Sequence, residues 1–150
     1  MRRMDANLRE YLQQNHNQLK WKERMKITFL TIDALYKIHK ENSIHRDFHS
    51  GNNIIFTVYN TWCISDFGFC GPANKSTCIY GNLPYIAPEV INEKEYTLKS
   101  DIYSIAMLMW EISSGQPPFI NYEHDCNLAI NIINDMRPKV ISEIRSEYKV

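Results

Sequence analysis

The segment Ile44–Asn53 reads IHRDFHSGNN, and it decides the fold. It places two histidines, an arginine, an aspartate and two asparagines directly before the apolar run Ile54–Phe56. Charged and amide side chains beside a buried strand are unfavourable unless they bond to one another or to a ligand. The sequence therefore predicts a functional loop at Ile44–Asn53, followed by a strand.

Three short motifs follow one another along the chain. The tripeptide His45–Asp47 (HRD) is followed by Asn52, Asp66–Gly68 (DFG) begins 19 residues after Asp47, and Ala87–Glu89 (APE) comes later. A single tripeptide of this kind is usually part of a turn. The three together, in this order, match the catalytic loop, the Asp-Phe-Gly motif and the Ala-Pro-Glu motif of protein kinases.

On these motifs the chain resembles the C-terminal lobe of a eukaryotic protein kinase. The resemblance implies a mainly α-helical fold with a small β-hairpin. It also implies that residues 1–150 form a partial kinase domain, which starts after the inter-lobe hinge and ends before the last helices. None of the five glycines precedes residue 51, and no strand lysine motif precedes the catalytic loop. We therefore expect the N-terminal lobe, which closes over ATP in kinases, to be absent.

The resemblance also assigns roles to individual residues. Asp47 corresponds to the base that accepts the proton of the substrate hydroxyl, and Asn52 and Asp66 correspond to the pair that binds Mg²⁺. One carboxylate and one amide oxygen suit this hard cation. Ile54 corresponds to the floor of the adenine site. ATP and Mg²⁺ are the implied cofactors.

His49 takes the place of the catalytic-loop lysine that is common in serine/threonine kinases, and we count it among the catalytic residues. This substitution is similar to the variant found in tyrosine-kinase-like serine/threonine kinases. The implied substrates are serine and threonine hydroxyls of proteins. Asp101 resembles the family's anchor for the backbone of the catalytic loop. Arg46 would pair with a phosphate on the following loop, where the candidate acceptors are Ser76, Thr77 and Tyr80.

Periodicity predicts the main helices. Asn7 and Glu10 have the spacing of a capping box, so a helix is expected from there to about Gln14. The apolar residues of 21–39 fall every three or four positions. They form one face with a second apolar set beside it, so this helix should be largely buried; the first face comprises Trp21, Met25, Phe29, Ile32 and Tyr36.

Further elements follow the loop. The runs Ile54–Phe56 and Trp62–Ile64 are expected to form a hairpin, and 69–85 to be a loop. Residues 102–112 are apolar almost all round, which predicts a helix surrounded by protein and ended by Gly115. A last helix is expected at 128–133.

Composition limits the function classes. Lys+Arg and Asp+Glu are both 17, which gives no basic footprint for a nucleic-acid partner. No apolar run reaches the length of a membrane span. The four cysteines contain no Cys-x-x-Cys pair, so we expect buried, reduced thiols in a cytoplasmic protein.

Three interpretations remain open at this point. The first is a serine/threonine kinase by descent that is inactive, or nearly so, as the isolated chain, and needs a separate N-terminal lobe or partner protein. The second is a docking module that uses residues 85–88 and the helix at 128–133. The third is a fragment of a longer kinase gene.

Overall fold

The computed structural model describes residues 6–51, 54–56, 62–65, 70–72 and 82–139. The helices are α1 (Leu8–Asn15), α2 (Trp21–Lys40), α3 (Pro88–Ile91), α4 (Leu98–Ser114) and α5 (Cys126–Ile133). The strands are β1 (Ala6–Asn7), β2 (Ser43–Ile44), β3 (Ile54–Phe56), β4 (Trp62–Ile64) and β5 (Gly71–Pro72), and Leu83–Tyr85 forms a 3₁₀ turn. The expected mainly helical fold with few strands is confirmed. Among the described residues, no helix is both long and apolar enough to cross a bilayer.

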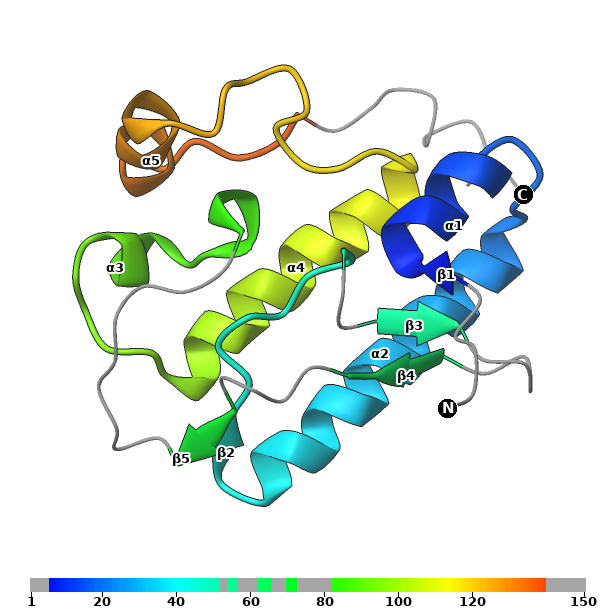
Figure 1. Ribbon diagram of the computed structural model, residues 1–150, viewed down its shortest axis with the longest axis horizontal. Helices are drawn as coiled ribbons and strands as arrows, with labels where there is room; N and C mark the ends of the chain where they lie inside the picture. Colours follow the sequence, from blue (N-terminus) through cyan, green and yellow to red (C-terminus); the bar gives the residue numbers. More distant parts are fainter. Residues whose placement is uncertain (1–5, 52–53, 57–61, 66–69, 73–81, 140–150) are drawn as a thin grey trace.

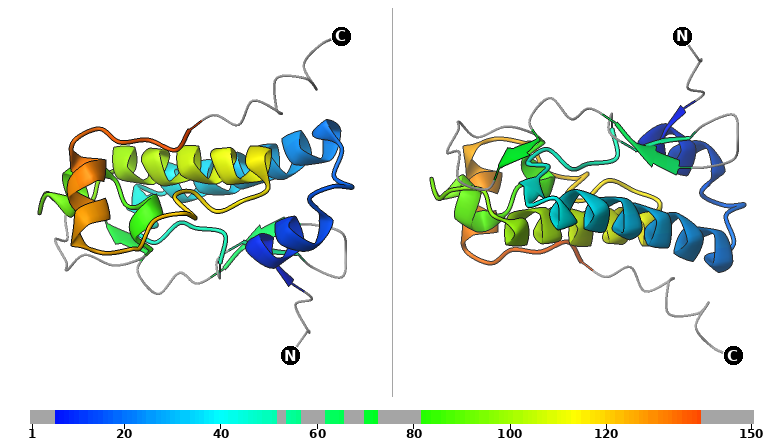
Figure 2. Two further views of the ribbon diagram at one scale, coloured as in Figure 1. Left: turned by 90° about the horizontal axis from the view of Figure 1, so that it is seen from above. Right: turned by 90° about the horizontal axis from the view of Figure 1, so that it is seen from below.

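The two long helices organise the molecule. Helices α2 and α4 lie side by side, and α1 lies near one end of the pair while α3 and α5 lie at the other (Figure 1). Seen edge-on, α2 and α4 form one layer, and α1 with the strands β3 and β4 covers one side of it (Figure 2). The other side of α2 has no helix or strand of the described chain against it.

Two small antiparallel sheets flank the Ile44–Asn53 loop. Strands β3 and β4 form the predicted hairpin, with Ile54 opposite Ile64, and β1 pairs with the outer side of β3. Strand β2, just before the loop, pairs with β5. The pairing of β2 with β5 was not predicted, because two-residue strands leave no periodic pattern in the sequence.

Local capping explains where the helices begin and end. The Asn7 side chain accepts from the Glu10 amide at 2.9 Å, as the capping-box spacing predicts. Thr97 and Ser100 exchange hydrogen bonds between side chain and backbone at the start of α4. Gly115 ends α4 in the left-handed conformation at φ +73°, which glycine adopts without strain.

The end of α4 is also held by a buried cation. Arg24 on α2 donates to the carbonyl oxygens of Ile112 and Ser113, and to that of His16 at 2.9 Å. A positive charge is favourable at this end of a helix, where carbonyl groups lack partners. A Cβ on Gly115 would lie 1.7 Å from the His16 ring, so this contact requires glycine.

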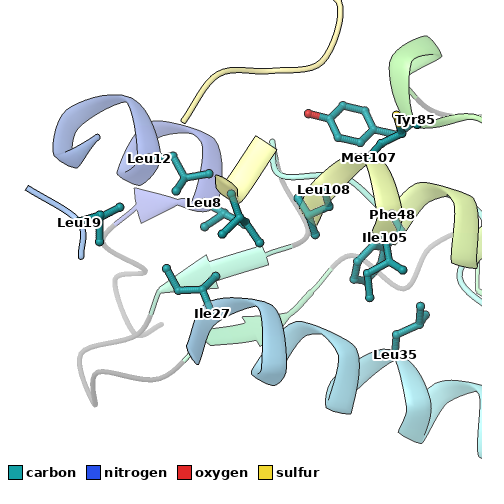
Figure 3. Close-up of a cluster of buried hydrophobic side chains, with 11 residues drawn as sticks. Leu8, Leu12, Leu19, Ile27, Leu35, Phe48, Tyr85, Ile105, Met107 and Leu108 are labelled. Atoms are coloured by element: carbon teal, nitrogen blue, oxygen red, sulfur yellow. The ribbon is translucent and has the colours of Figure 1, made fainter. Parts of the chain in front are cut away.

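The main core lies between the long helices, α1 and the hairpin. Its side chains come from α1, α2, the Ile44–Asn53 loop and α4, with Leu19 between α1 and α2 and Tyr85 from the 3₁₀ turn, and Figure 3 shows how they converge. The buried members include Leu8, Leu12, Leu35, Phe48, Leu108 and Ile112. Phe48 therefore fixes the centre of the loop by packing into the core, while its neighbours in sequence face other partners.

The burial predicted for α2 is wrong on one face. Phe29 and Tyr36 are 67% and 63% exposed, and Met25 and Ile32 are also exposed. The buried face is Ile27, Thr28, Thr31 and Leu35, which lies against β4 and α4. Both faces carry apolar residues at helical spacing, so periodicity could not tell which of them packs.

Two other burial predictions are also corrected. Helix α4 is not surrounded by protein within the described chain, since Ile102 is 53% and Met109 is 40% exposed. Cys63 and Cys126 are exposed free thiols and not core residues. Cys126 begins α5, where its side chain is not needed for packing, and Cys63 lies between two half-buried residues of β4.

Candidate active site

The loop that carries the His-Arg-Asp motif is buried. His45 and Ser50 have no exposed surface, and Asp47 and His49 are each 8% exposed. Polar side chains and backbone groups at this depth need partners. The structure supplies them mainly from helix α4, which crosses beneath the loop.

Asp101, in the first turn of α4, anchors the first half of the loop. Its Oδ2 accepts from the His45 amide at 2.8 Å, and its Oδ1 accepts from the Arg46 amide at 3.0 Å. The His39 Nε2 lies 2.8 Å from the same Oδ2. Hydrogen bonds to an ionised acceptor are roughly twice as strong as neutral ones. The anchoring role predicted for Asp101 is confirmed.

This anchor holds a strained residue. Arg46 has a φ of +71°, a left-handed conformation that costs an L-residue about 1–2 kcal/mol. A Cβ on Gly71 would lie 3.1 Å from Arg46 Nη1, so the glycine lets β5 run close to the arginine. The phosphate partner predicted for Arg46, on Ser76, Thr77 or Tyr80, lies outside the described residues.

Asp47 and His49 face each other within the loop. The His49 Nε2 lies 3.6 Å from Asp47 Oδ2, and His49 Nδ1 accepts a hydrogen bond from the Gly51 amide at 3.0 Å. Because Nδ1 accepts, the proton of the neutral imidazole lies on Nε2, on the side of Asp47. The backbone thus selects the tautomer that presents an N–H to the carboxylate.

Glu111, in the last turns of α4, anchors the second half of the loop. It is 1% exposed, and its two oxygens accept from Ser50 Oγ at 2.8 Å and from Tyr85 Oη at 2.6 Å. Arg9 Nε lies 3.8 Å from the same carboxylate. The Ser104 hydroxyl adds a bond to the Tyr85 carbonyl at 2.7 Å. Figure 3 shows the Tyr85 ring lying above the core, with its hydroxyl directed to the side of α1.

Burial dominates the electrostatics of this group. It raises the pKa of Glu111 above its ordinary value of 4.5, although the hydrogen bonds from Tyr85 and Ser50 and the charge of Arg9 act in the opposite direction. Burial, together with the adjacent carboxylate, also raises the pKa of the Tyr85 hydroxyl. The hydroxyl therefore stays a proton donor to Glu111 at neutral pH.

Sequence reasoning missed Glu111, Ser50, Tyr85 and Arg9. A signal was present, because Glu111 is the one carboxylate within the apolar run 102–112. An acidic residue on the core side of such a helix must find buried partners. The partners themselves come from three distant segments, and no spacing in the sequence connects them.

The structure brings together only part of the predicted site. Asp47 and His49 lie in one loop as described, and Ile54 begins β3, although its side chain is not described. Asn52 and Asp66 lie outside the described residues, so their predicted convergence with Asp47 stays a prediction.

Comparison with known proteins assigns the chain to a family. The sequence profile described as "Protein kinase domain" matches residues 1–149. The chain belongs to the protein kinase domain family. Within that family it is 36% identical over 122 residues to the serine/threonine-protein kinase CLA4 of Candida albicans, and the match covers 79% of this chain.

Other relatives are named in the same way. The chain is 37% identical over 95 residues to the serine/threonine-protein kinase STE20 of Eremothecium gossypii, and 34% identical over 95 residues to the serine/threonine-protein kinase shk1/pak1 of Schizosaccharomyces pombe. Each match covers 61% of this chain. The aligned part spans only 12%, 10% and 14% of the length of these three relatives.

Proposed function

We propose that this chain is the C-terminal lobe of a serine/threonine protein kinase, and that it positions a protein hydroxyl for attack on the γ-phosphoryl group of ATP. The observation that carries the proposal is the buried loop in which Asp47 faces the His49 N–H, held at both ends by carboxylates of α4. Phosphoryl transfer asks for placement and charge stabilisation more than for covalent chemistry.

In this proposal Asp47 accepts the proton of the substrate hydroxyl. A base must keep its geometry and its ionised state until the substrate arrives. The His49 Nε2 lies 3.6 Å from Asp47 Oδ2, so the imidazole stands beside the carboxylate that would act as the base. His49 at this position also supports the finer assignment to the tyrosine-kinase-like group, which remains part of the proposal.

Asn52 and Asp66 are the proposed holders of Mg²⁺. When bound, this ion neutralises and orients the phosphate oxygens. Ile54 and Ile64 are paired at one end of the β3–β4 hairpin. Asn52 precedes the first by two residues and Asp66 follows the second by two. This spacing along the chain supports the proposal that both residues serve one metal site.

Phosphate transfer would need more than these residues. Ile54 is the proposed floor for the adenine ring. The glycine-rich loop and the strand lysine that hold the phosphates in kinases are not found ahead of the catalytic loop in residues 1–150. We therefore expect phosphate transfer to depend on a clamp outside these residues, and to be slow or undetectable with residues 1–150 alone.

The docking alternative finds less support. Tyr85, Ile86 and Ala87 are at most 7% exposed, so they cannot offer a peptide-binding surface. Helix α5 buries Leu128 and Ile132 and exposes Ile130 and Ile133. An exposed pair of isoleucines is common on protein surfaces and does not by itself mark an interface. A cytoplasmic location is likewise a proposal, and it rests on free thiols at Cys63, Cys70 and Cys126.

The test separates metal binding from proton transfer. Thermal unfolding of the chain is followed with Mg²⁺-ATP, with Mg²⁺ alone and with ATP in EDTA. A ligand at about a hundred times its Kd adds roughly 2.7 kcal/mol, which is easily measured. We expect Mg²⁺-ATP to stabilise the wild type and D47N, and to stabilise D66N much less.

Transfer of labelled phosphate to a serine peptide is measured with residues 1–150 and a kinase N-terminal lobe supplied as a separate polypeptide. We expect D47N and D66N both to abolish it. Absence of stabilisation by Mg²⁺-ATP, together with absence of transfer, would contradict the enzyme function. Transfer that survives D47N would contradict the role of Asp47.

A further inference from the structure

Arg9 on α1 reaches the catalytic loop from outside it. Its backbone amide donates to the Ser50 carbonyl at 3.2 Å, and its Nε donates to Ser50 Oγ at 3.3 Å. Its Nη2 donates to Tyr85 Oη at 3.3 Å. The arginine side chain is 29% exposed, whereas Glu111, which these hydroxyls also contact, is 1% exposed. Arg9 is therefore the member of the cluster that solvent can reach.

The two hydroxyls link Arg9 to Glu111. A guanidinium can only donate hydrogen bonds and a carboxylate can only accept them. Ser50 Oγ, which accepts from Arg9, therefore donates to Glu111 at 2.8 Å, and Tyr85 Oη does the same at 2.6 Å. Each hydroxyl has the Glu111 carboxylate as an acceptor, and the two hydroxyl oxygens also lie 3.3 Å apart. The cation, the two hydroxyls and the anion thus form one connected hydrogen-bonded cluster. Such mutually polarised bonds fix the positions of their members.

This hydrogen-bonded cluster lies next to His49, the residue that faces Asp47. Ser50 follows His49 in the chain, and the centre of the Tyr85 ring lies 6.0 Å from the centre of the His49 ring. A Cβ on Gly51 would lie 3.0 Å from His49 Nδ1 and 3.6 Å from Arg9 Nη1. The imidazole thus has Tyr85, the Gly51 backbone and Asp47 as neighbours, and Arg9 reaches the other side of Gly51.

We propose that Arg9 is a positioning residue of the kinase site: acting through Ser50 and Tyr85, it fixes the His49 ring beside Asp47. The catalytic consequence of this inference rests on the proposed function, but the placement of the His49 imidazole can be tested without measuring activity. The positioning role explains why residue 9 is an arginine. The planar guanidinium reaches two hydroxyls at once, whereas the ammonium of a lysine is a single point charge.

The first experiment records the imidazole resonances of His49 by NMR in the 150-residue chain. The variants are R9M, which removes the fork, and K37M, a matched control. Lys37 also carries one positive charge and pairs with Asp33 at 2.7 Å, but both residues lie on the exposed side of α2. We expect R9M to move the His49 resonances and to raise their mobility, K37M to leave them as in the wild type, and R9K to resemble R9M more than the wild type.

A second variant covers the case in which R9M does not fold because Glu111 is left as an unpaired buried charge. In R9M/E111Q both charges are absent, and removing both members of such a pair is far less harmful than removing one. We expect this variant to fold, with the His49 resonances moved. The proposal would be overturned if R9M folds and its His49 resonances match those of the K37M control. It would also be overturned if the His49 resonances of R9M/E111Q match those of the wild type.

The catalytic consequence is a separate measurement, made with residues 1–150 and a kinase N-terminal lobe supplied as a separate polypeptide. A misplacement of about 1 Å can lower a rate roughly a hundredfold. We expect R9M to lower kcat by about tenfold or more and to change the KM for ATP by less than about threefold. A change in KM alone would contradict a positioning role. Absence of transfer in the wild type would contradict the proposed function, and the His49 resonances would still decide the placement.

Discussion

The two ends of helix α4 hold the same loop in different ways. Asp101 and Glu111 are ten residues apart on this helix, and both are 1% exposed. Asp101 accepts from two backbone amides of the loop, those of His45 and Arg46. Glu111 accepts from two side-chain hydroxyls, of which only that of Ser50 belongs to the loop.

The difference shows which anchors depend on sequence. Every residue except proline carries a backbone amide, so the Asp101 anchor is insensitive to which side chains occupy the loop. The Glu111 anchor needs a hydroxyl at Ser50, a phenol at Tyr85 and a cation at Arg9. The Asp101 end of α4 therefore holds the strained loop whatever its side chains are. At the Glu111 end, the choice of side chains can change the position of His49 and Asp47.

The largest expected effect is that of D101A. The variant leaves two buried backbone amides without their acceptor, and these amides cannot turn toward water. Removing one partner of a buried charged group typically costs about 3–5 kcal/mol. We expect a loss of that size in the free energy of unfolding, measured by urea denaturation. A loss below about 1 kcal/mol would mean that the backbone anchor is not needed.

E111A should have the next largest effect. It removes the acceptor of Ser50 and Tyr85, but Arg9 is partly exposed and can turn to solvent. We expect a loss of about 2–3 kcal/mol, smaller than for D101A, because an unsatisfied buried group costs roughly 1–3 kcal/mol. A loss larger than that of D101A would reverse the comparison between the two ends. Urea denaturation of both variants under one set of conditions provides the check.

Sequence reasoning found the Asp101 end and missed the Glu111 end for a physical reason. The role of Asp101 followed from the resemblance to the kinase family. The family can share this anchor because the backbone amides that it holds do not depend on which side chains the loop carries. The hairpin and the helix ends were also predictable, since short β-rich runs, capping residues and Gly115 are local signals. The partners of Glu111 come from α1, the loop and the 3₁₀ turn, and only the folded chain brings them together.

Burial was the weakest part of the prediction. Periodicity placed α2 and α4 correctly but did not show which apolar face packs, because Phe29 and Ile27 are equally apolar and lie on different faces. The structure resolves this for α2, where β4 and α4 cover the side with Ile27.

T97A sharpens the comparison at the Asp101 end. The Thr97 hydroxyl accepts from the Ser100 amide at 3.3 Å and caps the turn that carries Asp101. Loss of such a cap typically costs about 1 kcal/mol. We expect hydrogen exchange to increase at the His45 and Arg46 amides and to stay unchanged at the Arg9 amide. Equal increases at both ends would show that the two anchors are not independent.

The smallest expected effect is on the pH dependence of stability. The pKa of Glu111 is raised in the fold above its ordinary value of 4.5. The folded chain then binds more protons than the unfolded chain between these two pKa values. The contribution of Glu111 to the free energy of unfolding therefore falls as pH rises through that window, and is constant below and above it.

Urea denaturation of the wild type and E111Q across pH 4–8 checks this sign, since the other titrating groups are common to both. We expect the stability difference, wild type minus E111Q, to decrease as pH rises above about 4.5. An increase over the same range would mean that Arg9 and the two hydroxyls outweigh the effect of burial on Glu111.

The central proposal is that Asp47, Asn52 and Asp66 serve one metal–phosphate position. The most direct test titrates the chain with Mn²⁺-ATP, in which the paramagnetic ion stands in for Mg²⁺, and follows the broadening of backbone amide signals by NMR. The account predicts that the signals of these three residues broaden first and together, and that D66N removes the effect. Broadening that begins at separate places, or that needs no ATP, would contradict it.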